Sequence, residues 1–262
     1  MFEFSRYYGR RRIKGSLALA AGLAVLTSLY VWMFPSISEG IDLDAYVQSM
    51  PPALRVAFGI QSLGSIEGFL AAELYSFGIV LLMGLYLAYA AASVIADDVE
   101  DERMDMLLAL PVTRSKVLLE KFSALLVPIV VVNLVLPVVV YGGVLAIGES
   151  LSVADLLMAH ALSVPYLLAT ASVGLCASVW FDRTSLAQRA AMGAVFGLFL
   201  VDSVVTNTEF AALGALSPTR YYDPAAILVR SEYDLAGAAV LLVAAVVLVA
   251  ASRAYFRRKD IN

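Results

Sequence analysis

Long runs of hydrophobic residues alternate with short polar stretches along this 262-residue chain. The runs cover roughly residues 15–34, 69–96, 119–147, 157–181, 189–207 and 235–252. A helix needs about 20 apolar residues to cross the hydrocarbon core of a bilayer, so these runs predict six transmembrane helices. We therefore expect an all-α polytopic membrane protein, with one transmembrane domain over residues 1–262 and no nucleotide-binding domain.

The polar stretch between the second and third runs, residues 97–121, is too patterned to be a simple turn, and we call it the insert. Its acidic residues recur at spacings that place them on one helix face. They are Asp98, Asp101, Glu102 and Asp105. A second face is apolar and consists of Met104, Leu107 and Leu108. The first half of the insert is therefore predicted to be an amphipathic helix with one acidic and one apolar face.

Proline and basic residues mark the second half of the insert. Pro111 lacks a backbone donor, so the first helix should end just before it. Thr113 can cap a new helix that leads into the third run. The basic residues Arg114, Lys116 and Lys121 follow the cap. We expect two helices that meet at a proline corner.

The basic residues also predict the orientation, because cytoplasmic loops of membrane proteins carry an excess of Lys and Arg. With a cytoplasmic N-terminus, all but three of the 18 Lys and Arg residues fall in inner segments; the exceptions are Arg55, Arg220 and Arg230. Six spans then place both termini and the insert in the cytoplasm. An amphipathic helix there must lie on the membrane or in a groove of a protein. Its acidic face disfavours an anionic lipid surface, so we expect a soluble partner to dock on it.

Composition supports the membrane interpretation and limits the partners. Hydrophobic residues make up 61% of the chain and charged residues 15%, whereas soluble domains have about 45–50% and about 25%. We expect the chain to lie in the lipid bilayer of the cell membrane and to bind no nucleic acid. Arginine outnumbers lysine 14 to 4, and the outer segments are acidic. Either a halophilic organism or a high-GC codon bias with ordinary positive-inside asymmetry accounts for this balance.

The sequence contains no pattern that supports catalysis. A phosphate-binding loop requires GxxxxGK followed by Ser or Thr, and none of the four lysines has that context. Zinc hydrolases need several histidines, and the single histidine, His160, is expected at the membrane interface. The single Cys176 excludes an internal disulfide and a thiolate metal cluster. We predict no catalytic residue, no metal site and no cofactor bound by this chain.

Three polar residues lie inside the runs, where such groups are costly and often functional. They are Glu73, Asn133 and Asp202. We consider all three as candidates for a transport pathway. For Asp202 the alternative is an interfacial residue that marks the end of a helix.

The segment EDERMDMLLALPVTRSKVLLEKF resembles the segment after the second span of ABC-2 type transporter permeases. The matching residues are Asp105, Leu107, Leu108, Pro111, Val112, Thr113, Arg114 and Lys121. Glu102 and Arg103 stand where many members of that family have Gly-Thr. The aromatic, basic and Asp-Ile order of residues 256–261 is also similar to the end of these permeases.

This resemblance implies a membrane subunit of an ATP-driven transporter, and we expect an exporter. Two permease copies, identical or different, would pair and bind two separate ATP-binding subunits, which would hold ATP and Mg. The insert would be the coupling helix that docks in a groove of the ATP-binding subunit. The implied docking residues are Asp101, Met104, Asp105, Leu107, Leu108, Pro111, Thr113, Arg114 and Lys121.

Two other classes of protein remain open from the sequence. A non-transporting membrane anchor or assembly factor would share the docking insert and need no pathway. A membrane enzyme acting on lipid would need a catalytic cluster at the membrane surface, and the sequence shows none. The cargo of a transporter cannot be read from these residues.

Overall fold

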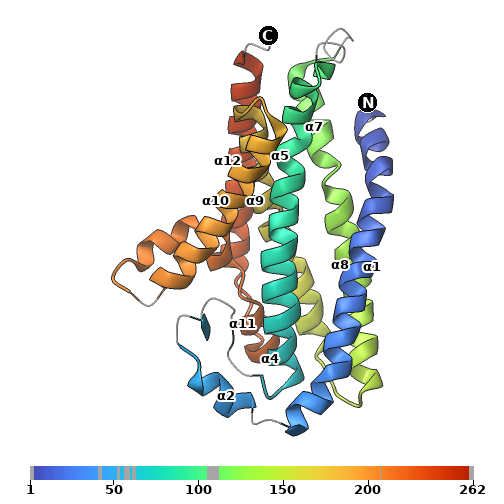
Figure 1. Ribbon diagram of the computed structural model, residues 1–262, viewed down its shortest axis with the longest axis vertical. Coiled ribbons are helices and arrows are strands. Elements are labelled where there is room, and N and C mark those ends of the chain that lie inside the picture. The colour runs from blue at the N-terminus through green and yellow to red at the C-terminus, as the bar shows by residue number, and fades with distance from the viewer. Residues whose placement is uncertain are drawn as a thin grey trace.

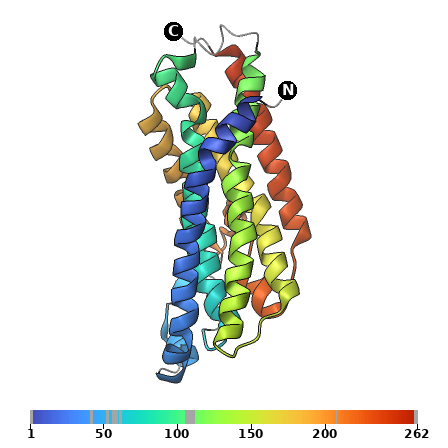
Figure 2. The same cartoon turned by 90° about the vertical axis from the view of Figure 1, so that its right-hand side faces the viewer.

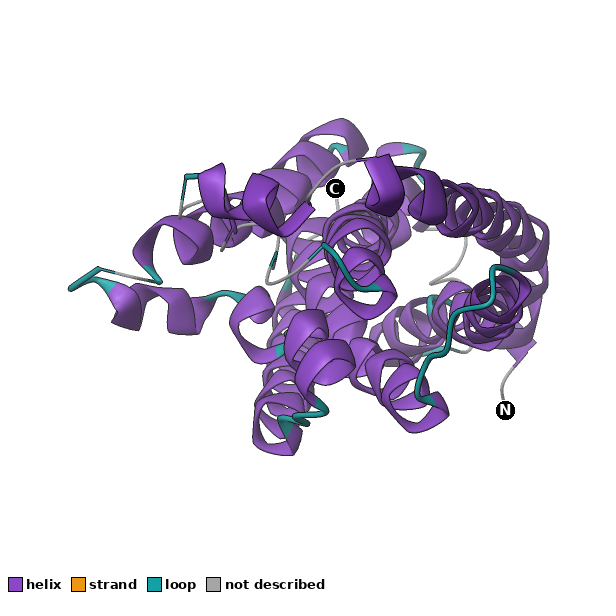
Figure 3. Ribbon diagram, turned by 90° about the horizontal axis from the view of Figure 1, so that it is seen from below, coloured by secondary structure: helices purple, strands orange, loops and turns teal. Residues whose placement is uncertain are grey.

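The computed structural model describes residues 3–40, 43–51, 54–55, 60, 63–104, 112–206 and 208–259. These residues form helices joined by short loops, and no strand occurs among them (Figure 3). The elements are α1 (Glu3–Gly40), α2 (Leu43–Ser49), α4 (Ile66–Leu70), η1 (Ala71–Met83), α5 (Gly84–Glu100), α7 (Arg114–Ser123), α8 (Leu126–Ala146), α9 (Val153–Trp180), α10 (Thr184–Val205), η2 (Ala211–Leu216), η3 (Pro218–Tyr221), α11 (Pro224–Arg230) and α12 (Leu235–Arg258).

Six helical stretches in the described part of the chain are long and apolar enough to cross a membrane. They are Gly9–Gly40, Ile66–Glu100, Arg114–Ala146, Val153–Trp180, Thr184–Val205 and Leu235–Arg258. Each overlaps one of the six predicted runs. The prediction of an all-α polytopic membrane protein with six spans is therefore confirmed.

Apart from α10, which extends away from the bundle, the long helices stand side by side, and both chain ends lie at the same end of the bundle (Figure 1). We call this end the basic end, because α12 finishes there with Arg257 and Arg258. The second and fourth spans are the most buried and form the centre. α9 packs against both α5 and α12, and α1 runs along α8 (Figure 2). The two flanks of the insert, the end of α5 and the start of α7, also lie at the basic end (Figure 1).

A proline divides the third span into α7 and α8. Pro128 has no N–H to donate, and its ring would clash with the carbonyl of Ala124, four residues earlier. The chain makes short turn bonds there instead, from Leu125 N to Phe122 O at 2.9 Å and from Val127 N to Ala124 O at 3.3 Å. Helix α7 can therefore take its own direction at the basic end.

The second span contains a wider π-helical stretch, η1. At its end the backbone N–H of Gly84 donates to Ile79 O and Leu81 O. The carbonyl of Val80 instead accepts the buried hydroxyl of Tyr166, at 2.8 Å. This contact requires a glycine, because a Cβ on Gly84 would lie 2.8 Å from that hydroxyl oxygen. π-helical turns occur frequently at functional sites, and η1 borders both polar clusters described below.

The predicted acidic face of the insert does not form one continuous helix. Helix α5 ends at Glu100, and Glu102 adopts a left-handed backbone with φ of 54°. Acidic residues at a helix C-terminus are unfavourable to the helix dipole. The reversal at Glu102 lets Arg103 fold back onto these acids, where it pairs with Asp97 at 2.6 Å and Asp101 at 3.0 Å. The prediction that Asp98, Asp101 and Glu102 lie on one continuous helix was therefore wrong.

Candidate functional site

A buried ion pair joins the two flanks of the insert. Lys121 of α7 pairs with Asp98 of α5, and each side chain is only 7% exposed. The Lys121 ammonium also donates to the Val94 carbonyl at 2.8 Å. Arg103 lies on the other side of the same carboxylate, with Nε 3.4 Å from Asp98 Oδ1. Lys121, expected among the docking residues, therefore faces its own protein and holds α5 against α7.

Arg114 of the insert binds the end of the last helix. Its guanidinium donates to the Lys259 carbonyl and, at 3.4 Å, to the Phe256 carbonyl. It also lies 5.9 Å from the centre of the Phe256 ring. A cation there satisfies carbonyls that have no partner within the helix and complements the helix dipole. Arg114 thus joins α7 to α12.

Two further contacts at the basic end involve α9 and α10. The Lys259 ammonium donates to the Val179 carbonyl at 2.8 Å and pairs with Asp182 at 2.5 Å. The Glu100 carboxylate accepts the backbone N–H of Thr184, at the start of α10, at 2.8 Å. These contacts link α5 to α7, α7 to α12, α12 to α9 and α5 to α10. The circuit closes through the short loop at Asp182, which joins α9 to α10. We call this circuit the clasp, and its side chains are Asp98, Lys121, Arg114, Lys259, Asp182 and Glu100.

The remaining docking candidates are placed as follows. Thr113 caps α7 as expected, and its hydroxyl accepts the N–H of Lys116 at 3.3 Å. Met104 is 1% exposed and belongs to the hydrophobic core of this chain. Asp101 is 55% exposed. Asp105, Leu107, Leu108 and Pro111 lie outside the described residues.

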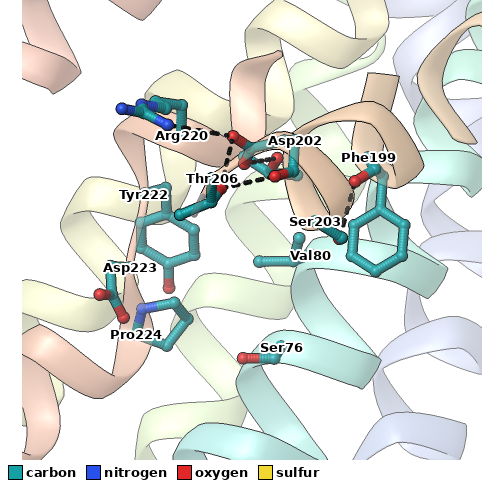
Figure 4. A pocket seen from close by; sticks show the side chains of 11 residues that line it. Ser76, Val80, Phe199, Asp202, Ser203, Thr206, Arg220, Tyr222, Asp223 and Pro224 are labelled. Atoms are coloured by element: carbon teal, nitrogen blue, oxygen red, sulfur yellow. Dashed lines mark hydrogen bonds and ion pairs between the residues drawn. The ribbon is translucent and has the colours of Figure 1, made fainter. Parts of the chain in front are cut away.

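A polar pocket lies toward the other end, between η1, α10 and α11 (Figure 4). Its volume is about 230 Å³. Its lining combines hydroxyl, carboxylate and guanidinium groups with a few apolar side chains. The residues are Ser76, Val80, Phe199, Asp202, Ser203, Thr206, Thr219, Arg220, Tyr222, Asp223 and Pro224. The pocket places Asp202, a predicted pathway residue, beside η1.

The carboxylate of Asp202 is held by residues that follow α10. Thr219 donates to it at 2.7 Å, and the Arg220 guanidinium lies 3.7 Å away. Figure 4 shows Asp202, Thr206 and Arg220 grouped at one side of the pocket. A Cβ on Gly214 would lie 2.6 Å from Asp202 Oδ1, so only glycine permits this approach. Asp202 therefore ties the end of α10 to η3 and lies close against Gly214 of η2.

A second polar cluster lies inside the bundle. Tyr75 of η1 bonds to Nε2 of His160 at 2.9 Å, and Nδ1 of the same ring bonds to Asn133 Oδ1 at 2.9 Å. Ser163 donates to the same Asn133 oxygen at 2.9 Å. His160 is 4% exposed, so its ring lies among the helices of the bundle and is not presented to the surroundings. Buried polar groups need such partners because an unsatisfied one costs about 1–3 kcal/mol.

Glu73 also lies on η1 and is half-buried. Within the described part of the chain, its carboxylate has no side-chain hydrogen bond or ion pair. All three pathway candidates therefore lie on η1 or next to it. Glu73 is part of η1, and Asn133 is connected to it through His160. Asp202 lines the same pocket as Ser76 of η1.

Comparison with known families identifies the class of protein. A family model described as "ABC-2 family transporter protein" matches residues 11–261. The chain belongs to the ABC-2 transporter family. No curated protein matched it. It is a transmembrane permease, a membrane component of transport that is not itself catalytic, and such permeases generally work with an ATP-binding subunit.

The sequence patterns pointed to some of the permease's polar contacts and missed others. They singled out Lys121 and Arg114 by charge, but nothing local indicated that both side chains face inward. Asn133 stood out as polar sequence in an apolar run. Tyr75 did not, because tyrosine is common in membrane helices and its hydrogen bond to His160 spans 85 residues.

Proposed function

We propose that this permease is the membrane subunit of an exporter driven by a separate ATP-binding subunit, which docks on the insert. ATP and Mg would bind to that partner. The clasp is the observation that carries the proposal. It links both flanks of the insert to α10 and α12, so a push on the insert would move several spans together.

Docking would use the apolar residues Leu107 and Leu108. Met104 is occupied by the core of the permease itself and would anchor the near end of the insert. The exposed carboxylates Asp97 and Asp101 flank this end and would meet polar groups at the rim of the groove.

We further propose that the basic end faces the cytoplasm, with both termini there and the permease in the cell membrane. Arg257 and Arg258 end α12, and Arg114 and Lys116 begin α7. Concentration of positive charge at one end supports this orientation.

Two permease copies would pair, as one homodimer or as two related chains. Helix α10 supports this proposal because it has an unoccupied apolar face. Phe196, Leu200 and Val204 are 42%, 44% and 65% exposed and recur every four residues. A Cβ on Gly193 or Gly197 would meet nothing within 4 Å. Glycines four residues apart allow close helix approach in membranes.

The cargo route would pass along η1, beside the candidates Glu73, Asn133 and Asp202. Two observations support this choice. Both polar clusters contact η1, and the Val80 carbonyl of this π-helical stretch accepts a hydrogen bond from Tyr166 of another span.

Copurification tests the docking proposal. The tagged permease is expressed with ATP-binding subunits of the same organism, and association and ATP hydrolysis are measured. Changing Leu107→Asp and Leu108→Asp together should abolish association, because two charges would enter an apolar groove. The matched control, Leu107→Met with Leu108→Met, should associate normally. Undiminished association of the Asp variant would remove the docking role of the insert.

A further inference from the structure

An apolar groove runs along the surface of the bundle between α7, α9 and α12, the helices grouped in Figure 2. Its volume is about 340 Å³. Leu119 and Phe122 of α7 and Leu168 of α9 form two walls, and α12 forms the third with residues from Leu242 to Arg253. Apart from Ser172, whose hydroxyl donates to the Leu168 carbonyl, the lining is apolar until Arg253.

The length of the groove matches one leaflet of a bilayer. From Leu242 to Arg253 a helix rises about 16 Å at 1.5 Å per residue. The hydrocarbon core of a bilayer is about 30 Å thick, so one leaflet contributes about 15 Å. Arg253 lies at the basic end of the groove, where the headgroups of that leaflet would begin.

The Arg253 guanidinium has N–H groups available to bind a further acceptor at this position. Its Nε donates to Ser115 of α7 at 3.0 Å, and a guanidinium carries five N–H donors in all. Among the described residues no other partner of this side chain is present, and Arg257 follows one turn later with its side chain exposed. Arginine binds phosphate through two parallel hydrogen bonds more readily than lysine does.

We infer that this groove binds an anionic phospholipid of the leaflet at the basic end. One acyl chain would lie along α12 between Phe122 and Leu242, and the phosphate would sit on Arg253. Charge complementarity favours an anionic lipid, because Arg253 is the one charged residue of an otherwise largely apolar groove and the exposed Arg257 follows it one helical turn later. The bound lipid would join α7 to α12, the same two helices that Arg114 joins, and would stabilise the clasp. This inference rests on membrane insertion of the family and not on docking of the ATP-binding subunit.

Fluorescence quenching in vesicles tests the inference. The full chain carries Phe122→Trp as its sole tryptophan, with Trp32→Phe and Trp180→Phe, and is reconstituted in phosphatidylcholine. Brominated phosphatidylglycerol or brominated phosphatidylcholine is then added at equal mole fraction. Because one basic residue near a membrane favours anionic lipid by about fivefold, we expect about fivefold stronger apparent binding of the anionic quencher.

Two pairs of variants separate the headgroup site from the chain site. Arg253→Gln should remove the preference for phosphatidylglycerol, whereas Arg258→Gln, with the same charge change outside the groove, should keep it. Ala250→Phe should fill the groove and weaken quenching by both lipids, and Ala251→Phe, on the neighbouring position, should not.

Three results would overturn the inference. Equal quenching by both lipids in the parent chain would mean that any lipid covers the groove. Absence of quenching by either lipid would mean that protein, such as a second copy, covers it. An unchanged preference in the Arg253→Gln variant would place the anionic site elsewhere.

Discussion

Replacing Lys121 by Met should destabilise the permease more than any comparable change of a surface lysine. Lys121→Met keeps the length of the side chain but removes the ammonium that pairs with Asp98. Both groups are 7% exposed, so the carboxylate would stay in a poorly hydrated site with one partner fewer.

The size of the effect follows from the burial of the pair. Removing one partner of a buried ion pair costs about 3–5 kcal/mol, because the other charge stays desolvated. Arg103 Nε remains 3.4 Å from Asp98 and compensates in part, so the cost should be near the lower bound, about 3 kcal/mol. For a chain of this size about 1 kcal/mol shifts the melting temperature by about 2 °C, which gives about 6 °C.

Thermal unfolding in detergent measures this shift. The control Lys116→Met removes an exposed lysine that lies 3.8 Å from Glu120, and such pairs contribute about 0–1 kcal/mol. The double variant Asp98→Asn with Lys121→Met should recover most of the loss, because no buried charge is left alone. A melting temperature of Lys121→Met equal to that of Lys116→Met, or a double variant no better than the single one, would refute the reasoning.

Two other predictions concern the centre of the bundle. Gly174→Ala should lower stability by about 1–3 kcal/mol through overpacking, because its Cβ would lie 2.2 Å from the Ala88 carbonyl. The control Gly142→Ala, whose Cβ meets nothing within 4 Å, should not lower it. Equal melting temperatures of the two variants would contradict the packing of α9 on α5. His160→Leu should lower stability by about 1–3 kcal/mol, because the buried Tyr75 hydroxyl loses its partner. Adding Tyr75→Phe should restore part of that loss in the same unfolding assay. If the double variant instead lost the sum of the two single losses, the hydrogen bond between Tyr75 and His160 would not contribute to stability.

The sequence predicted the six transmembrane helices well, because each helix depends only on residues that are close together in the chain. About 20 apolar residues specify a transmembrane helix without reference to other spans, and Thr113 caps α7 through an N–H only three residues away. The same local reasoning failed at Glu102, where periodicity predicted a continuous helix. The left-handed turn there is stabilised by Arg103 and its three acidic partners, which a pattern of spacings does not contain.

By itself the sequence determined six spans, the concentration of positive charge beside the insert, and the motif in the insert that resembles ABC-2 permeases. These follow from hydrophobicity, charge and short motifs, each of which depends on neighbours in the chain. Only the tertiary structure decided that Lys121 and Arg114 face inward, that His160 is buried, and that the insert is tied to α10 and α12. Those facts depend on contacts between residues more than 20 positions apart, such as Lys121 with Asp98 and Arg114 with Lys259. The cost of burying a charge or a polar group made these pairings necessary, and the packing of the helices selected the partners.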